Sequence, residues 1–349
     1  MSATYLLESV SDRAAGPAGD KEQGHSDAVW AAKWARTAGG GEVVVTAGAD
    51  HTVKLWNPSA AGTPTRTIRA PKSLGIVSVD VEKAETGASF FVSSSLDSVI
   101  SRWSIDGEAQ GRKELGPAES WAVSLHPRTE VLATSGQEGT VRVLSASVEG
   151  FGEELAKMDA AGSFGTSVEY SKGGNLLAVA SESGYVSLFD AETGSLISSF
   201  PAHSAPIRSL SFTSNLLVTG SDDKRINVFD LRALTSTSGA AGAGGRRGQV
   251  ASLGGHEGWV VKVEARNERL LASGSSDGTI KLFDLSSPSS ALSTLRDHTG
   301  DVWSLAWAPE SPGSIPQVEG LGGAAAGLGG GRLVSAGEDG KLRWWRGGG

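Results

Sequence analysis

The sequence of 349 residues contains no cysteine, so it can form neither a disulfide framework nor a thiolate metal site. Its formal net charge of −8 provides no positive surface for a phosphate backbone, and we expect no direct contact with nucleic acid. No apolar run approaches the roughly 20 residues of a membrane helix, and the first residues do not resemble a secretory signal. These absences predict a cytoplasmic and nuclear protein without membrane contact.

Helix signals are also scarce, whereas short β-branched runs separated by glycine, proline and serine occur throughout the chain. One segment, ASGSSDGTIKLFDL at 272–285, is the clearest of seven similar copies. The other copies share its tight turn and the alternating strand that follows, and they lie at 46–57, 93–104, 134–145, 179–190, 219–230 and 335–346. Most spacings between the turns are 40 to 47 residues, which is about the length of one propeller blade.

A single repeat contains four short strands. Between 250 and 285 they are expected at 250–253, 259–265, 269–275 and 279–285, joined by turns such as SDG. Four such strands make one antiparallel sheet, which by itself exposes both of its faces. Arranging seven copies around a ring buries these faces, so the repeat predicts an all-β, seven-bladed propeller.

Four residue types recur in fixed register around each turn: an aspartate, a Ser or Thr four residues before it, an aromatic residue six after it, and an upstream histidine. A buried aspartate is costly unless it is hydrogen-bonded, and a histidine, a hydroxyl and an indole N–H can complete such a network. We call this set the polar clamp and predict it to be structural. Its predicted members are His25, Thr46, Asp50 and Trp56; His203, Thr219 and Asp223; His256, Ser273 and Asp277; and His298, Ser335, Asp339 and Trp345. Three blades depart from the pattern, with Lys72 in place of the histidine, Leu144 in place of the aromatic residue and Ser183 in place of the aspartate.

This register, over residues 25–346, resembles that of the WD-repeat β-propeller family. The predicted blades are 25–69, 70–115, 116–158, 159–200, 201–253, 254–295 and 296–346. Four segments also resemble the WD-repeat subunits of the superkiller complex: GIVSVD (75–80), SSSLDSVISRW (93–103), GPAESWAVSLHP (116–127) and APIRSLSF (205–212).

The second resemblance implies a scaffold that joins a tetratricopeptide-repeat subunit and an RNA helicase. It implies a monomeric propeller within a hetero-complex that supports cytoplasmic 3′–5′ mRNA decay by the exosome. In fungi it also implies meiotic recombination with the double-strand-break protein, and in animals a scaffold role in a transcription-elongation complex.

The last blade lacks an outer strand, because only RGGG follows Trp345. The strand-like segment at 4–10 has no partner nearby in sequence, so we predict that it pairs with 341–345 and closes the ring. The stretches 11–23, 234–249 and 310–331 are rich in glycine, alanine or small polar residues, and they are predicted to be flexible loops.

The candidate partner-binding residues lie at the start of each inner strand. In the WD-repeat family these positions surround the mouth of the central channel on the top face, and aromatic residues with charged neighbours there are typical of a surface that anchors a partner. The predicted binding residues are Trp30, Glu119, Trp121, Phe164, Arg208, Trp259, Asp301 and Trp303. Trp34 and Trp307, deeper in the pattern, are predicted to be core residues.

No catalytic, metal or cofactor site is predicted. His51 and His126, outside the clamps, have no nucleophile or metal partner at a useful spacing, and GEDGKL at 337–342 lacks the pattern of a phosphate loop. A non-catalytic scaffold is therefore favoured over an enzyme. A reader of modified lysine remains an alternative, in which an aromatic cage with Asp301 or Glu119 holds a methylammonium group.

Overall fold

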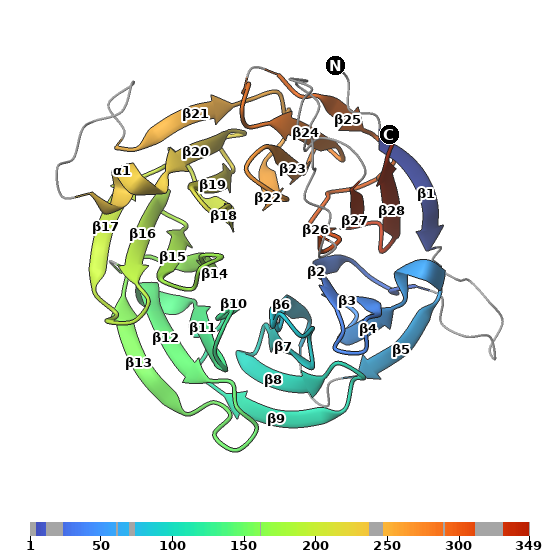
Figure 1. Ribbon diagram of the computed structural model, residues 1–349, viewed down its shortest axis with the longest axis horizontal. Helices are drawn as coiled ribbons and strands as arrows, with labels where there is room; N and C mark the ends of the chain where they lie inside the picture. Colours follow the sequence, from blue (N-terminus) through green and yellow to red (C-terminus); the bar gives the residue numbers. More distant parts are fainter. Residues whose placement is uncertain are drawn as a thin grey trace.

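The computed structural model describes residues 5–11, 24–60, 62–69, 74–160, 162–236, 247–288, 290–310 and 331–348. Seven four-stranded antiparallel sheets stand around a central axis (Figure 1). In six of them the strands follow chain order from the axis to the rim, and in the seventh the outermost strand comes from the N-terminal end of the chain. The predicted all-β, seven-bladed propeller is confirmed.

The blades are built from strands of three to eight residues. Blades one and two are β2 (Val29–Arg36), β3 (Glu42–Gly48), β4 (Thr52–Trp56), β5 (Pro64–Arg69), and β6 (Ile76–Val81), β7 (Phe90–Ser95), β8 (Val99–Ser104), β9 (Ala109–Glu114). Blades three and four are β10 (Ala122–Leu125), β11 (Val131–Ser135), β12 (Thr140–Ser145), β13 (Glu154–Asp159), and β14 (Gly165–Tyr170), β15 (Leu176–Ser181), β16 (Tyr185–Asp190), β17 (Leu196–Pro201). Blades five and six are β18 (Ile207–Phe212), β19 (Leu216–Ser221), β20 (Ile226–Asp230), β21 (Gln249–Leu253), and β22 (Val260–Ala265), β23 (Leu270–Ser275), β24 (Ile280–Asp284), β25 (Ser293–Leu295). Blade seven is β26 (Ser304–Trp307), β27 (Arg332–Ala336), β28 (Leu342–Gly347) and β1 (Tyr5–Ser11).

The hydrophobic core lies between adjacent blades. The middle strands are buried on both faces, as β15 shows over its whole length, because each sheet packs against a neighbour on either side. Trp34 packs edge-on against Trp344 at 5.5 Å between ring centroids, in the cluster that joins blades seven and one. Trp34 and Trp307 are both buried, as predicted for core residues.

The ring is closed by β1, which pairs antiparallel with β28 from Tyr5 opposite Gly347 to Ser11 opposite Leu342. Tyr5 is buried, and its ring packs edge-on against that of Trp307 at 5.8 Å. At the other end of the strand, the Oγ of Ser11 accepts a hydrogen bond of 3.0 Å from the backbone N–H of Leu342. Closure of the ring by the N-terminal strand is confirmed.

The predicted flexible loops lie largely outside the described residues. At their edges the structure is ordered: Ser11 ends β1, and Leu234 is buried in the short helix α1 (Leu231–Thr235). The side chain of Asp230 caps this helix, and Leu234 packs into the core beside blade five. These two contacts stabilise a helical turn directly after strand β20. Short 3-10 helices occur at Pro58–Ala60 and Gln137–Gly139. Among the described residues, no helix has the length and apolar character required to cross a membrane.

Candidate functional site

The polar clamp has the same geometry in four blades. In blade one, His25 Nε2 lies 2.7 Å from Thr46 Oγ1 and His25 Nδ1 lies 2.9 Å from Asp50 Oδ2, while Trp56 Nε1 donates to Thr46 Oγ1 at 2.8 Å. In the other three clamps the histidine lies 2.9 to 3.1 Å from its aspartate: His203 from Asp223, His256 from Asp277 and His298 from Asp339. The same three histidines each lie 2.8 Å from a hydroxyl oxygen, which belongs to Thr219, Ser273 and Ser335 respectively. In blade seven, Trp345 Nε1 also donates to Ser335 Oγ at 2.8 Å.

The charges in these clamps follow from burial and hydrogen bonding. Burial lowers the pKa of His256 and of His298, although their aspartate partners act in the opposite direction, so both rings are neutral at pH 7. Burial raises the pKa of Asp339, but the interactions with His298, the backbone N–H of Lys341 and the charge of Arg343 together outweigh it and hold this pKa well below its usual range. In the clamps of blades six and seven, a neutral imidazole is therefore paired with a carboxylate.

Blades that lack the histidine use other groups. In blade two, Trp103 Nε1 donates to Ser93 Oγ at 3.0 Å, while Lys72 lies outside the described residues. In blade three, Ser120 Oγ lies 2.7 Å from the hydroxyls of both Ser94 and Thr134 and so forms a chain of hydroxyl groups. In blade four, Ser183 lies 2.9 Å from Ser181 between their hydroxyl oxygens.

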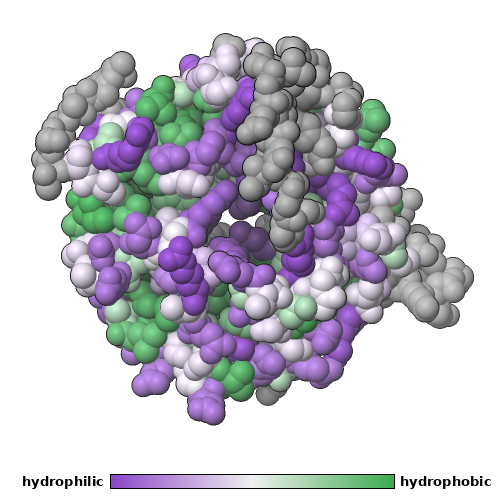
Figure 2. Space-filling model, in the orientation of Figure 1, coloured by the Kyte–Doolittle hydropathy of each residue, from purple (hydrophilic) through white to green (hydrophobic). Residues whose placement is uncertain are grey.

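A cavity of about 780 Å³ occupies the channel on the axis of the ring. In the space-filling view the centre of the ring is hollowed and hydrophilic residues gather around it (Figure 2). Five of the eight predicted binding residues line the cavity, each from a different blade: Trp30, Trp121, Phe164, Arg208 and Trp303. We call the end of the channel that these residues surround the mouth.

A β-bulge explains why several of these side chains face the channel. The ladder between the first two strands skips one residue in five blades, and the skipped residues are Trp30, Val77, Thr166, Arg208 and Val261. A bulged residue is unpaired and its side chain is turned away from the regular alternation of the strand. Trp121 and Trp303 take the equivalent place directly before β10 and β26, where their backbone N–H groups donate to Ser135 and Ala336.

The other three predicted binding residues, Glu119, Trp259 and Asp301, are not among the described residues that line the cavity. Glu119 is held in the loop before β10 by Arg142. Trp259 is 48% exposed, and the guanidinium carbon of Arg208 lies 5.7 Å from its ring centroid. Burial raises the pKa of Asp301, as does the nearby carboxylate of Glu338. These three residues lie beside the mouth rather than in it.

Sequence reasoning missed Leu96 and Glu182, which also line the cavity. Val77, Thr166, Pro206 and Val261 line it as well, at positions that the register of the repeats already placed at the start of the inner strands. Leu96 is also exposed, although it is apolar and lies in the turn before Asp97. An apolar residue at the tip of an otherwise polar turn is the signal that could have revealed it.

Two carboxylates of the inner strands, Asp80 and Glu264, have lysine partners. Lys33 and Lys83 lie 3.6 and 3.3 Å from the carboxylate of Asp80, and Lys262 lies 3.3 Å from Glu264. Asp80 Oδ2 also accepts a hydrogen bond of 2.7 Å from the backbone of Leu125 in the next blade. Among the described residues, no group of three His, Asp or Glu side chains could hold a metal ion.

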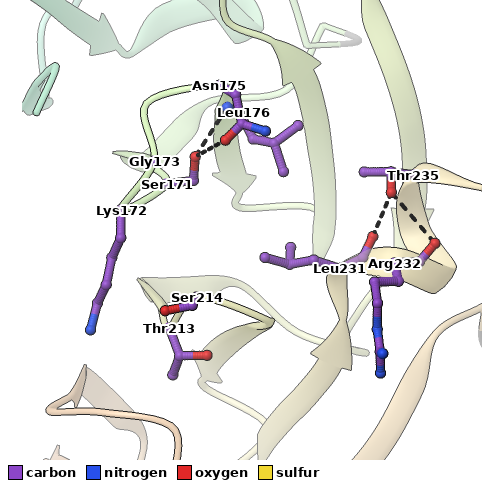
Figure 3. A pocket seen from close by; sticks show the side chains of 10 residues that line it. All are labelled: Ser171, Lys172, Gly173, Asn175, Leu176, Thr213, Ser214, Leu231, Arg232 and Thr235. Atoms are coloured by element: carbon purple, nitrogen blue, oxygen red, sulfur yellow. Dashed lines mark hydrogen bonds between the residues drawn. The ribbon is translucent and has the colours of Figure 1, made fainter. Parts of the chain in front are cut away.

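A second pocket of about 440 Å³ lies between blades four and five, at the opposite end of β14 from the mouth. Its hydroxyl groups bond within the protein: Ser171 Oγ donates to Asn175 Oδ1 at 3.1 Å and Thr235 Oγ1 donates to the carbonyl of Leu231 at 2.9 Å (Figure 3). None of the predicted site residues lines this pocket, so the mouth is the candidate functional site.

Comparison with known proteins agrees with the architecture. Residues 21–57 and 289–346 match the family described as WD domain, G-beta repeat, and residues 162–311 match the N-terminal β-propeller domain described as nucleolar protein 10-like.

The similar proteins include the WD repeat-containing protein SL1-17 of Schistosoma mansoni, 29% identical over 61% of this chain and 69% of that protein. WD repeat-containing protein VIP3 of Arabidopsis thaliana is 30% identical over 55% of this chain and 62% of that protein. Meiotic recombination protein rec14 of Schizosaccharomyces pombe is 27% identical over 35% of this chain and 40% of that protein. WD-repeat propellers are generally non-catalytic scaffolds that bind protein partners. The chain therefore folds as a seven-bladed β-propeller, contains WD repeats at 21–57 and 289–346, and is similar to WD repeat-containing proteins.

Proposed function

We propose that this protein is a non-catalytic interaction scaffold that binds a segment of a protein partner at the mouth of its channel. The observation that carries the proposal is the convergence of four aromatic side chains and Arg208, from five blades, on one cavity. Large aromatic side chains can each bury about 150–250 Å² against a partner, and they dominate the affinity of many interfaces. Trp121 is 37% exposed, so much of its ring is available for such a contact.

Within this function, the partners we propose are the tetratricopeptide-repeat subunit and the RNA helicase of the superkiller complex. The support is the likeness of four segments to WD-repeat subunits of that complex. The protein would then assist 3′–5′ mRNA decay in the cytoplasm. Similarity to a protein named for meiotic recombination supports an additional nuclear role with the double-strand-break protein.

A scaffold of a transcription-elongation complex is the other assembly to test, because the same mouth could serve either partner. A reader of modified lysine has less support, since the carboxylate of Glu119 is already paired with Arg142. Asp301 likewise is not among the described residues that line the cavity.

The test uses calorimetric titration of the purified protein with the purified tetratricopeptide-repeat subunit from the same organism. Trp121→Ala and Trp303→Ala are compared with Tyr185→Ala, a control that removes an exposed aromatic residue of β16 outside the cavity. Loss of an interface anchor typically costs about 2 kcal/mol or more, so we expect the first two variants to bind roughly thirtyfold more weakly. We expect the control to bind like the wild type.

Melting temperatures separate binding from folding. A core tryptophan commonly costs about 3–5 kcal/mol when it is truncated to alanine, whereas we expect only small changes at the mouth. Unchanged affinity in Trp121→Ala and Trp303→Ala would exclude the mouth as the binding site. If wild-type protein does not bind this subunit, the superkiller assignment fails, and the subunits of the transcription-elongation complex are titrated next.

A further inference from the structure

In blade three, the loop before β10 is joined to the turn between β11 and β12 by charged groups that differ from those of the polar clamp. In the clamped blades the turn aspartate reaches to the preceding loop, as where Asp50 Oδ2 accepts a hydrogen bond of 3.0 Å from the backbone N–H of Ser26. In blade three, Glu138 stands in place of the aspartate and Gly116 in place of the histidine. The loop itself supplies the carboxylate, from Glu119, and strand β12 supplies the cation, from Arg142.

Arg142 makes two ion pairs from a largely buried position. Its Nη2 lies 2.6 Å from Glu119 Oε1, and its Nη1 contacts Glu154 on the outer strand β13. The second oxygen of Glu119 accepts a hydrogen bond of 2.8 Å from the backbone N–H of Gly116. Burial raises the pKa of Glu119, but the hydrogen bonds from Arg142 and Gly116 and the nearby positive charges together outweigh it and lower this pKa, so the pair is ionised at neutral pH.

This ion pair holds the loop against the turn at Gly136. The carbonyl of Ala118 accepts a hydrogen bond of 2.8 Å from Gln137, and a Cβ at Gly136 would lie only 2.2 Å from that same carbonyl oxygen. Ala118 has a φ of 58°, in the left-handed region that is unfavourable for residues other than glycine, so the loop depends on tertiary contacts to keep this shape.

The contacts continue from the turn to the mouth. The carbonyl of Gly136 accepts a hydrogen bond of 2.8 Å from Gly165, the residue after Phe164. Trp121 follows Glu119 by two residues, and its ring packs edge-on against that of Phe164 at 5.6 Å between centroids. A continuous chain of contacts therefore joins the side chain of Arg142 to both rings of this aromatic pair.

We propose that Arg142 is a positioning residue for the binding surface: by holding Glu119 over Gly136 it sets the geometry of the Trp121–Phe164 pair. The functional meaning rests on the proposed role of this pair as an anchor. The geometric effect can be measured without any partner, so it fails or succeeds independently of the proposed function.

The experiment uses fluorine NMR of the full chain labelled with 5-fluorotryptophan. The signals of Trp121 and Trp303 are assigned from Trp121→Phe and Trp303→Phe. Arg142→Met removes the charge while keeping a long side chain, and Arg142→Lys keeps the charge without the planar fork that can bridge two carboxylates. The matched control is Arg66→Met, which breaks an exposed Arg–Glu pair of 2.6 Å with Glu108 between blades one and two.

We expect Arg142→Met to shift or broaden the Trp121 signal while the Trp303 signal keeps its wild-type position. Arg142→Lys should give an intermediate change, and Arg66→Met should change neither signal. A Trp121 signal that stays at its wild-type position in Arg142→Met overturns the proposal, whatever happens to the melting temperature. Equal changes in all tryptophan signals would also overturn it, because they would show a general loss of stability instead of local positioning.

Discussion

Blades seven and three both carry an arginine four residues after the acidic residue of the turn, on the third strand of the blade, but the two arginines bind different partners. In blade seven, Arg343 Nη1 lies 2.7 Å from Asp339 Oδ2 and 2.7 Å from His298 Nδ1, so the arginine is added to a complete clamp. In blade three Gly116 stands in place of the clamp histidine, and Arg142 instead binds Glu119.

The difference shows that a blade needs a polar connection between loop and turn more than it needs one particular set of groups. In blade seven the clamp is buried, and its aspartate reaches the loop before Trp303 through the backbone N–H of Thr299. In blade three the ion pair is partly exposed and takes its carboxylate from the loop itself, two residues before Trp121. We infer that blade seven is specialised for stability and blade three for the geometry of the binding surface.

The largest expected effect concerns the closure that distinguishes blade seven, whose outer strand β1 comes from the other end of the chain. Tyr5→Ala removes a buried aromatic ring, and we expect the free energy of unfolding to fall by about 4 kcal/mol, measured by chemical denaturation. The matched control is Leu155→Ala on the outer strand of blade three, where the side chain is mostly exposed and we expect little change. Equal losses in the two variants would show that closure by β1 adds no special stability.

We expect a smaller loss of stability from removing the carboxylate of either connection, and this loss should be larger for the clamp of blade seven than for the ion pair of blade three. Asp339→Ala leaves His298 and Arg343 buried without their carboxylate partner, so we expect a loss of roughly 3 kcal/mol in the free energy of unfolding. Glu119→Gln keeps the shape of the side chain in a partly exposed pair, so we expect a loss of about 1 kcal/mol. If Glu119→Gln proves as costly as Asp339→Ala, the contrast between the two blades is wrong.

The smallest expected effect is on the pH dependence of stability. The pKa values of His256 and His298 are lowered in the fold by burial, so below a pH of about 6.5 the unfolded chain binds more protons at these rings than the folded protein does. Stability should therefore fall as the pH drops from 7.5 to 5.5. The clamp aspartates Asp277 and Asp339 have depressed pKa values in the fold, so the stability that they contribute is lost only below about pH 4.

The measurement compares thermal unfolding at the two pH values in the wild type and in a variant that combines His256→Gln with His298→Gln. We expect the variant to be less stable at both pH values but to show a smaller difference between them. A difference as large as that of the wild type would mean that these clamps do not titrate as described.

The sequence by itself determined the number of blades, the register of the clamp residues and the closure of the ring. These features follow from a local pattern that is repeated seven times, and from a last copy that lacks one strand. The same register placed Trp30, Trp121, Phe164, Arg208 and Trp303 at or just before the start of the inner strands, and the resemblance to WD-repeat propellers implied that these positions surround the channel.

Only the tertiary structure decided which of the predicted residues share the mouth. A β-bulge in the inner strands turns Trp30 and Arg208 toward the channel. No residue type in the sequence predicts this bulge. The role of Glu119 depends on Arg142, which lies 23 residues away in the chain and reaches the loop only when β12 is paired inside its sheet. Periodic patterns specify which strands pair, whereas the partner of a single charged side chain is set by the close packing of segments that are distant in sequence.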